Sequence, residues 1–305
     1  MTRLIYDQFS KDYLEELLSP YGEVKAPQRV ASEVREIDLY FRPLPNLELA
    51  MVRPLGILGR MAASPNPSIF EPFRNPVSED EICDCLGKLL DVRRSLQRQA
   101  NRNNRRLSNE ALPKLWILTP TASPTILSRF SAMLEENWLP GIYGMGEAFR
   151  SAIVVIHQLP QTPETLWLRL LGRGRVQEQA IDELEALSPD IPLRSMTLNL
   201  LYHLERTLAV RQDLDEGDRA LIMRLAPLYQ QEQEKAFQQG ERQGLQQGLQ
   251  EGERQVIEDI LRTRFGSIDE ELVAIIESVM ELPSAEFVPL LLQLEREELL
   301  QRFNS

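Results

Sequence analysis

The segment SIFEPFRNPVSEDEICDCLGKLLDVRRSLQRQ, residues 68–99, decides the fold because a short strand in it leads directly into a long helix. Ser78 and Glu81 have the spacing of a capping box, in which each side chain satisfies a backbone N–H of the other residue. Acidic residues at 79–81 suit the positive end of a helix. Apolar residues then recur at helical spacing, and they are Ile82, Leu86, Leu89, Leu90 and Leu96. A long helix beginning at Ser78 is therefore predicted.

Upstream of this segment, the chain has the pattern of one helix followed by strands. Residues 7–22 carry apolar side chains at helical spacing and end in proline and glycine. The ranges 23–33 and 35–43 alternate or run apolar with β-branched and aromatic residues, which is typical of strands. The range 55–63, LGILGRMAA, is a further short strand in this prediction.

Downstream, two apolar segments are predicted as buried strands. They are KLWILTP at 114–120 and RSAIVVIHQLP at 150–160, and each ends at a proline. Helices mixed with strands indicate an α/β sheet domain, which we assign to residues 1–160. Beyond it every periodic stretch is helical, so we expect an α-helical extension that starts with a helical region at 161–229.

Composition bounds the class of protein. A chain of 305 residues has room for two or more domains. With 43% hydrophobic and 26% charged residues it is typical of a soluble globular protein. No stretch approaches the roughly 20 apolar residues of a membrane span, and the N-terminal residues lack the apolar core of a signal peptide. We expect a cytoplasmic protein without a membrane partner.

Cysteine and histidine usage excludes several kinds of site. Cys83 and Cys85 are the only cysteines, and their spacing points them to different sides of a helix. This argues against a disulfide framework and a zinc site. His157 and His203 are the only histidines and stand far apart in apolar surroundings. Triads that depend on histidine are therefore not expected.

The net charge of −12 is unevenly distributed. Residues 1–150 hold 19 basic and 19 acidic residues, whereas residues 151–305 hold 15 and 27. The whole acidic excess therefore lies in the second half, where it favours solubility. The first half remains free to approach phosphate groups.

Four glycines recur at intervals of four residues within 237–256. Each glycine in a helix interior costs about 1 kcal/mol relative to alanine. Spacing of four aligns them as a smooth stripe beside Leu245 and Leu249, and the glycines are Gly240, Gly244, Gly248 and Gly252. The segment is either a helix that contacts a second copy or another partner, or a flexible linker rich in glutamine and glycine. It resembles the glycine-repeat helix of flagellar assembly proteins that regulate the export ATPase.

The C-terminal residues carry a more specific resemblance. In order, they contain ILRTRFG, SIDEEL, IIESVMELPSAEF and a leucine-rich end. This order resembles the small C-terminal domain of unknown function found on bacterial proteins of the recombination-promoting nuclease and transposase group. The resemblance divides the helical extension into a glycine-repeat helix or linker at 230–255 and a small helical domain at 256–305.

The same resemblance implies a restriction-endonuclease-like core, the PD-(D/E)xK fold, for residues 1–160. Such a core consists of a helix, three antiparallel strands, a helix and a further strand, and this order is similar to the one predicted above. One strand supplies an aspartate, and the next supplies an acidic residue followed two positions later by lysine. The carboxylates hold Mg²⁺, an ion that prefers oxygen ligands and stabilises charge on a phosphate under attack.

Asp38 and Glu71 match the two acidic positions and are the expected metal ligands. Asp38 lies in the apolar segment REIDLYF, and Glu71 lies in the strand before the long helix. The pattern departs at the lysine, because Phe73 stands there and Arg74 follows it. Arg74 is the candidate for the catalytic cation, although an arginine cannot take part in proton transfer.

Other interpretations of these acids stay open. Glu15, Glu33 and Glu36 are candidates to assist the site. Alternatively, Asp38 pairs with Arg35 or Arg42 as an ordinary strand-end carboxylate, and the second acid is a surface residue near a turn.

Six arginines follow the apolar stripe of the long helix with almost no acid among them. Arginine at this density favours contacts with DNA phosphates. The alternative is a solvated helix end whose cations complement the helix dipole. The candidate DNA-binding residues are Arg93, Arg94, Arg98, Arg102, Arg105 and Arg106.

Two function classes follow. The first is a metal-dependent DNA endonuclease-like phosphodiesterase of a mobile-element or recombination-associated family, with either an active or a degraded centre. It brings Asp38 and Glu71 close together. The second is a non-enzymatic oligomeric or adaptor protein that works through the glycine-stripe helix, and it leaves these carboxylates apart or in ordinary ion pairs.

Overall fold

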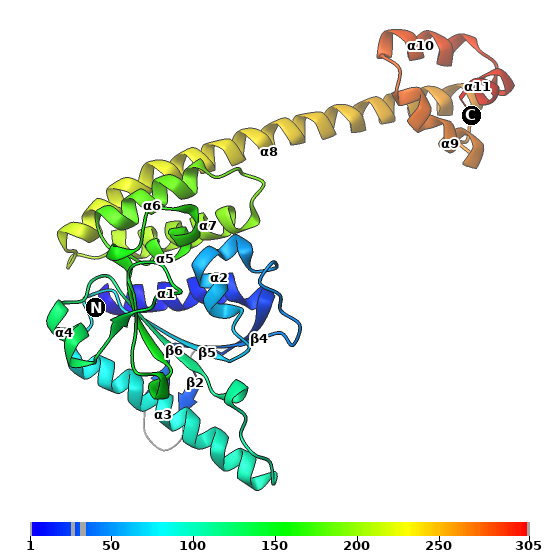
Figure 1. Ribbon diagram of the computed structural model, residues 1–305. Coiled ribbons are helices and arrows are strands. Elements are labelled where there is room, and N and C mark those ends of the chain that lie inside the picture. Colours follow the sequence, from blue (N-terminus) through cyan, green and yellow to red (C-terminus); the bar gives the residue numbers. More distant parts are fainter. Residues whose placement is uncertain (1, 26–27, 31–34, 304–305) are drawn as a thin grey trace. The chain divides into compact units, whose positions relative to one another are not determined.

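The chain folds into two compact units, Met1–Pro227 and Leu228–Ser305. Their structure is a computed structural model that describes residues 2–25, 28–30 and 35–303 (Figure 1). The first unit contains the residues assigned above to the sheet domain and all but the last two residues of the following helical region. The glycine repeat and the small C-terminal domain lie entirely in the second unit.

A mixed seven-stranded sheet forms the centre of the first unit. Its strand order is β1-β4-β5-β6-β9-β8-β7. β1, β4 and β5 are antiparallel, β5, β6 and β9 are parallel, and β9, β8 and β7 are again antiparallel. An α/β domain followed by helices, as predicted from the sequence, is therefore confirmed. The strands are β1 Gly22–Lys25, β4 Leu39–Pro43, β5 Ser68–Pro72, β6 Lys114–Thr119, β7 Met133–Leu134, β8 Ile142–Gly144 and β9 Ser151–Val155.

A separate two-stranded ribbon stands beside this sheet. It consists of β2 (Gln28–Val30) and β3 (Arg35–Ile37), paired antiparallel. The chain leaves the ribbon at Ile37 and enters the large sheet at Leu39. Both residues are fully buried. The segment that contains Asp38 is therefore apolar because it crosses from one sheet to the other inside the core.

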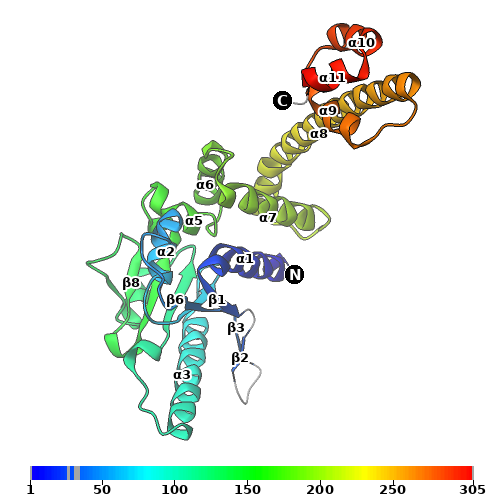
Figure 2. The same ribbon diagram turned by 90° about the vertical axis from the view of Figure 1, so that its right-hand side faces the viewer.

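Helices cover both faces of the central sheet (Figures 1 and 2). α3 (Glu79–Arg102) lies on one face, where its apolar stripe packs on Ile69, Ile117 and Ile153. α1 (Thr2–Leu18) lies on the other face with α2 and α5. Strands β5 and β9 are buried along their whole length because both faces of the sheet are covered.

The remaining helices of the first unit range from the four residues of α5 to the 18 residues of α7, and the described chain contains no strand beyond β9. The α-helices are α2 Gly56–Ala62, α4 Pro124–Arg129, α5 Leu166–Arg169, α6 Arg175–Ala186 and α7 Pro192–Ala209, and the first turns of α8 also belong here. Single turns of 3₁₀-helix lie at Ser19–Tyr21, Arg53–Leu55, Asn109–Ala111, Glu147–Phe149, Ile156–Gln158 and Pro163–Thr165.

The strand predicted at 55–63 is wrong, because this segment forms α2. Its buried residues Ile57, Leu58 and Met61 follow helical spacing. A Cβ at Gly59 would overlap the carbonyl oxygen of Val52, so only glycine allows the helix to pack this closely. A short apolar run does not distinguish a buried strand from a buried helix, and this explains the error.

The second unit consists of the greater part of α8 and three shorter helices. Helix α8 runs from Glu216 to Phe265 without a break, so the glycine repeat lies inside a helix. α9 (Glu270–Met280), α10 (Ser284–Gln293) and α11 (Arg296–Phe303) complete the unit. Its own core includes Ile257, Leu261, Ile275, Phe287 and Leu291. Among the described helices, none combines the length and the apolar character of a membrane span.

The capping box that begins α3 is present as predicted. The Ser78 hydroxyl accepts a hydrogen bond from the Glu81 N–H at 3.3 Å, and the Ser78 N–H donates to the Glu81 carboxylate at 2.9 Å. Two N–H groups that have no partner inside the helix are thereby satisfied.

Replacing Ser78 by alanine is expected to lower the free energy of unfolding by about 1 kcal/mol, because the Glu81 N–H loses its acceptor. Urea unfolding followed by tryptophan fluorescence measures this, since Trp116, Trp138 and Trp167 all lie in the first unit. Ser95→Ala, at an exposed position in the same helix, is the control and should change stability by less than about 0.5 kcal/mol. Equal losses of stability in the two variants would contradict the capping role.

Candidate functional site

Asp38 lies at the junction between β3 and β4. Its neighbours Ile37 and Leu39 are fully buried, whereas the Asp38 side chain is 16% exposed. The Asp38 N–H donates to Glu71 Oε1 at 3.4 Å. The crossing between the two sheets thus places this aspartate beside the second predicted acid.

Glu71 lies on β5 and is buried, with 1% of its surface exposed. Side chains alternate along a strand, so Glu71 points to the same face as Ile69, which is the face covered by α3. Lys88 reaches it from α3, and the distance from Lys88 Nζ to Glu71 Oε2 is 2.6 Å. The Lys88 side chain is itself only 17% exposed. Lys88 thus donates a hydrogen bond to the buried carboxyl group.

A second lysine holds Asp38. Lys11 on α1 places its Nζ 2.9 Å from Asp38 Oδ1 and 2.8 Å from Asp7 Oδ2. Two carboxylates and two ammonium groups therefore meet where α1, the β3–β4 junction, β5 and α3 converge. We call Asp38, Glu71, Lys88 and Lys11 the carboxylate–lysine cluster.

The cluster opens into a cavity of about 320 Å³. Asp38, Glu71 and Lys88 all line it, and Asp84 and Cys85 on α3 form part of its wall. The cavity offers a mixed set of carboxylate oxygens and an ammonium group to anything that enters. This arrangement suits a ligand that combines a cation with an anion.

Burial and mutual charge perturb the titration of the cluster. Burial, followed by the nearby charge of Asp38, raises the pKa of Glu71 to about 8, and Lys88 opposes this rise. Burial acts to lower the pKa of Lys88, but attraction to Glu71 outweighs it, so this pKa is raised. Burial also raises the pKa of the Cys85 thiol. Positive charge delivered into the cavity would lower the pKa of Glu71 and favour its ionised form.

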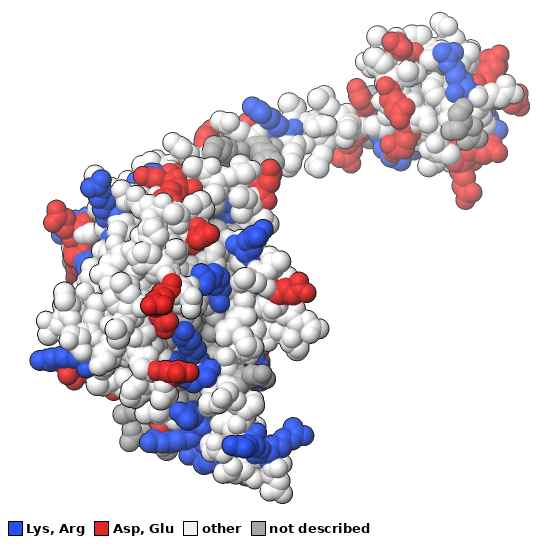
Figure 3. Space-filling view, viewed as in Figure 1, with Lys and Arg blue, Asp and Glu red and all other residues white. Residues whose placement is uncertain are grey.

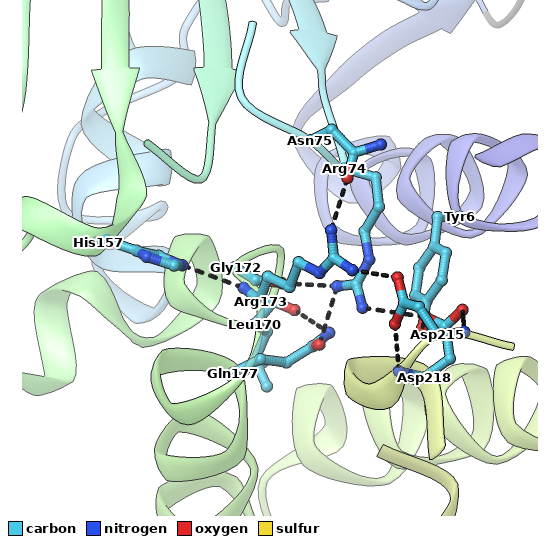
Figure 4. A network of polar contacts seen from close by, with 10 residues as sticks. All are labelled: Tyr6, Arg74, Asn75, His157, Leu170, Gly172, Arg173, Gln177, Asp215 and Asp218. Atoms are coloured by element: carbon cyan, nitrogen blue, oxygen red, sulfur yellow. Dashed lines mark hydrogen bonds and ion pairs between the residues drawn. The ribbon is translucent and has the colours of Figure 1, made fainter. Parts of the chain in front are cut away.

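Arg74, the sequence candidate for the catalytic cation, also lines this cavity, and its guanidinium belongs to a further network of polar contacts (Figure 4). Its guanidinium stacks over the Tyr6 ring at 3.7 Å from the ring centroid. Nη1 donates to the carbonyl oxygen of Gly172 at 2.9 Å and to Gln177 Oε1 at 3.1 Å. Nη2 lies 3.6 Å from Asp218 Oδ1, which also accepts a hydrogen bond from the Tyr6 hydroxyl. Arg74 is thus held between several elements at the cavity, whereas Lys88 is the cation in contact with Glu71.

Arg173 extends this network around Arg74. It donates to Asn75 Oδ1 at 2.7 Å and pairs with Asp215 at the start of α8. Its backbone N–H donates to His157 Nε2 at 3.3 Å. Figure 4 shows these side chains converging from separate parts of the first unit. The network joins the segment after β5 to α1, to α6 and to the start of α8.

Two of the three acids predicted to assist the site, Glu15 and Glu36, are not among the described residues that border the cavity. Glu15 is exposed on α1, and neither it nor Glu36 on β3 lines the cavity wall. Glu33 lies outside the described residues. Asp38 pairs with Lys11, and Arg42 instead lies 3.9 Å from Glu23.

The six arginines are all exposed, four of them on α3 and two just after it. Lys and Arg side chains gather at the end of the first unit where α3 finishes (Figure 3). Arg94 pairs with Asp91 at 3.0 Å. By the helical repeat, Arg98 and Arg102 lie within roughly 80° of the face that carries Lys88. Basic residues therefore extend from the cluster along the same helix.

Lys88 and Lys11 were not singled out from the sequence. Lys88 interrupts an apolar run, CLGKLL, and this interruption is the one local signal for it. Lys11 follows Asp7 by four residues, which indicates an ordinary helix pair and gives no hint of Asp38.

The residues present suit a divalent ion of the Mg²⁺ type. Mg²⁺ usually takes one or two carboxylates and completes its shell with water and phosphate oxygens. Asp38 and Glu71 supply two carboxylates at one cavity. The described residues contain no group of three or more histidine, cysteine, aspartate or glutamate side chains arranged for a metal.

Comparison with known proteins adds no assignment. The chain matches no protein-family model, and no curated protein or solved structure matches it significantly.

Stability should depend on pH through Glu71. Because the pKa of Glu71 is raised to about 8 from its ordinary value of 4.5, the folded state retains a proton that the unfolded state releases. The contribution to stability is therefore complete below about pH 4.5 and is lost as the pH rises through 8. Relative to Glu71→Gln, the unfolding free energy of the wild type should fall by up to about 1.4 kcal/mol per pH unit in this window.

Urea unfolding of both proteins at several pH values measures this difference. Glu147→Gln, at an exposed position of the same unit, is the control and should leave the wild-type pH profile unchanged. A constant difference between the wild type and Glu71→Gln would refute the perturbed carboxyl group.

Proposed function

We propose that the chain is a metal-dependent DNA endonuclease of the restriction-endonuclease-like type, with Asp38 and Glu71 as its Mg²⁺ ligands. The observation that carries the proposal is the contact of Lys88 Nζ with Glu71 Oε2 at 2.6 Å, beside Asp38, in a cavity. Two carboxylates and a lysine are the residue types that the resemblance implies. In the family pattern this lysine stands two residues after the second acid, where this chain has Phe73. Here Lys88 of α3 supplies the ammonium group instead, so two carboxylates and a lysine are still present.

The order of elements supports the same proposal. α1 is followed by the antiparallel strands β1, β4 and β5, then by α3 and by the parallel strand β6. Apart from the β2–β3 ribbon and α2, which are inserted among the strands, this order is similar to the helix, three strands, helix and strand of the PD-(D/E)xK core. Asp38 directly precedes the second of these strands and Glu71 lies on the third, so neighbouring strands supply the two acids.

Each residue of the cluster then has a chemical role. Asp38 and Glu71 would hold Mg²⁺, which supplies positive charge at the phosphate and makes water more acidic. Lys88 donates to Glu71 and, on the cavity wall, can donate to a phosphate oxygen as negative charge develops. Lys11 holds Asp38 in place through a second ion pair.

The oligomeric or adaptor alternative has one observation in its favour. Both carboxylates are ion-paired, and ordinary structural pairs have this geometry too. The shared cavity favours the nuclease, because purely structural pairs do not require an opening for a ligand.

Purified protein with Mg²⁺ or Mn²⁺ should nick supercoiled plasmid at low salt. Asp38→Asn, Glu71→Gln and Lys88→Met should each reduce the nicking rate by roughly 100-fold or more, because each removes a ligand or a charge from the cavity. Lys25→Met, at an exposed position on β1, is the matched control and should cut normally. Isothermal titration with Mn²⁺ provides a second measurement, and binding should be abolished in the two carboxylate variants. Absence of both nicking and metal binding in folded wild type would refute the nuclease and favour the alternative.

We further propose that the α3 arginines bind the DNA backbone. Removing one phosphate-binding side chain should reduce the slope of log K against log salt concentration by about 0.9. Arg98→Gln combined with Arg102→Gln is therefore expected to weaken binding to a fluorescent duplex and to flatten its salt dependence. Fluorescence anisotropy at a series of salt concentrations measures both effects.

The control removes the same charge elsewhere. Arg262→Gln combined with Arg302→Gln changes two exposed arginines of the second unit. It should leave the salt slope unchanged. Equal effects of the two double variants would show that net charge, and not the α3 arginines, governs binding.

A further inference from the structure

The second unit exposes four large apolar side chains on one side of α8. Phe237, Leu245, Leu249 and Val256 have exposed fractions of 68%, 65%, 61% and 48%. With about 100° of rotation per residue, all four fall within a sector of roughly 120°. The buried residues Ile257 and Leu261 of the same helix point to the opposite side. The exposed face is therefore separate from the face that builds the core of the unit.

The same sector is unpartnered in the part of the single chain that the structure describes. Every residue from Gly240 to Glu253 is exposed. A Cβ placed at Gly240, Gly244, Gly248 or Gly252 would meet no described atom within 4 Å. Glycine disfavours a helix more than any residue except proline. A stretch with four glycines and no packed neighbour depends on a partner to stay helical.

We infer that the partner is a second copy of this chain, packed antiparallel on α8 with the two-fold axis between Gln246 and Gln247. In this register Leu245 lies beside Leu249 of the partner subunit, on the same flank and within about 1.5 Å of its level along the axis. Gly244 lies beside Gly248 of the partner subunit in the same way. Leucine thus meets leucine on one flank, and glycine meets glycine where the two backbones approach most closely.

Charge selects the antiparallel orientation. Glu241 lies near the centre of the exposed sector by the helical repeat. In a parallel pair in register, Glu241 would face Glu241 of the partner subunit, and like charges repel. In the antiparallel register it faces Gly252 of the partner subunit. Arg242 then lies on the same flank as Glu253 of the partner subunit, within about 3 Å of its level along the axis. The two-fold axis creates this ion pair twice. Such pairs favour the antiparallel orientation more than they raise the affinity of the two subunits for each other.

This interface is independent of the nuclease proposal. It uses only residues of the second unit, from Phe237 to Val256, and none of the carboxylate–lysine cluster.

Light scattering of the full chain tests the stoichiometry. The wild type should have about twice the chain mass of 35.1 kDa. Leu245→Gln combined with Leu249→Gln should halve that mass. The matched control, Val273→Gln combined with Leu292→Gln, changes two exposed apolar residues of the same unit away from α8 and should stay dimeric. Monomeric wild type, or a dimer unaffected by the α8 variant, would overturn the inference.

Spin labels test the orientation. The chain would carry Gln231→Cys together with Cys83→Ser, since Cys85 is buried and Cys83 is exposed. In the antiparallel register Gln231 is level with Arg262 of the partner subunit, so the two labels lie about 46 Å apart along the axis. A parallel pair in register would hold the labels within about 20 Å, because packed helix axes are only about 10 Å apart. The longer distance in pulsed electron paramagnetic resonance supports the inference, and the shorter one overturns it.

Discussion

The contact between Glu71 and Lys88 is the interaction on which the first unit depends most. A carboxyl group in the middle of a covered sheet is unfavourable unless a polar partner meets it, and here α3 delivers that partner. The pair therefore fixes the position of α3 along β5 as well as its distance from the sheet. It also keeps polar atoms exposed to a cavity within an otherwise apolar layer.

Asp38 is held by a second lysine, Lys11. The backbone leaves the small ribbon and enters the large sheet at this residue, so its N–H is able to bind Glu71 while its carboxylate turns to Lys11. Helices from both faces of the sheet thus contribute one lysine each to the carboxylate–lysine cluster. Such convergence of separate elements is the usual way in which a fold builds a polar site, since no single element supplies enough charge.

Local sequence patterns predicted much of the fold. The predictions failed where the structure depends on contacts between residues far apart in the chain. The capping residues Ser78 and Glu81 and the periodic apolar stripe define α3 within a few residues of sequence. α2 was missed because an apolar run this short is compatible with a buried strand as well as with a buried helix. The strand pattern led to Asp38 and Glu71, because neighbouring strands place them side by side. Lys88 became visible only through packing, since helix rotation decides which residue faces β5.

Arg74 illustrates the same limit. Its hydrogen-bond partners Gly172 and Gln177 lie 98 and 103 positions away in the sequence, so no local sequence pattern predicts these contacts. The sequence alone left it as the nearest available cation to Glu71, whereas the folded chain uses it to join α6 and α8 to the strand end.

That junction sets the smallest portion of the chain able to fold by itself. Tyr6 and Arg74 are buried against residues between Gly172 and Asp218, so a fragment ending near residue 160 would expose an aromatic ring and a guanidinium to water. A sheet transferred to another protein, by recombination or by design, would have to carry with it the helices up to the first turn of α8. The sheet and these helices therefore form one folding unit.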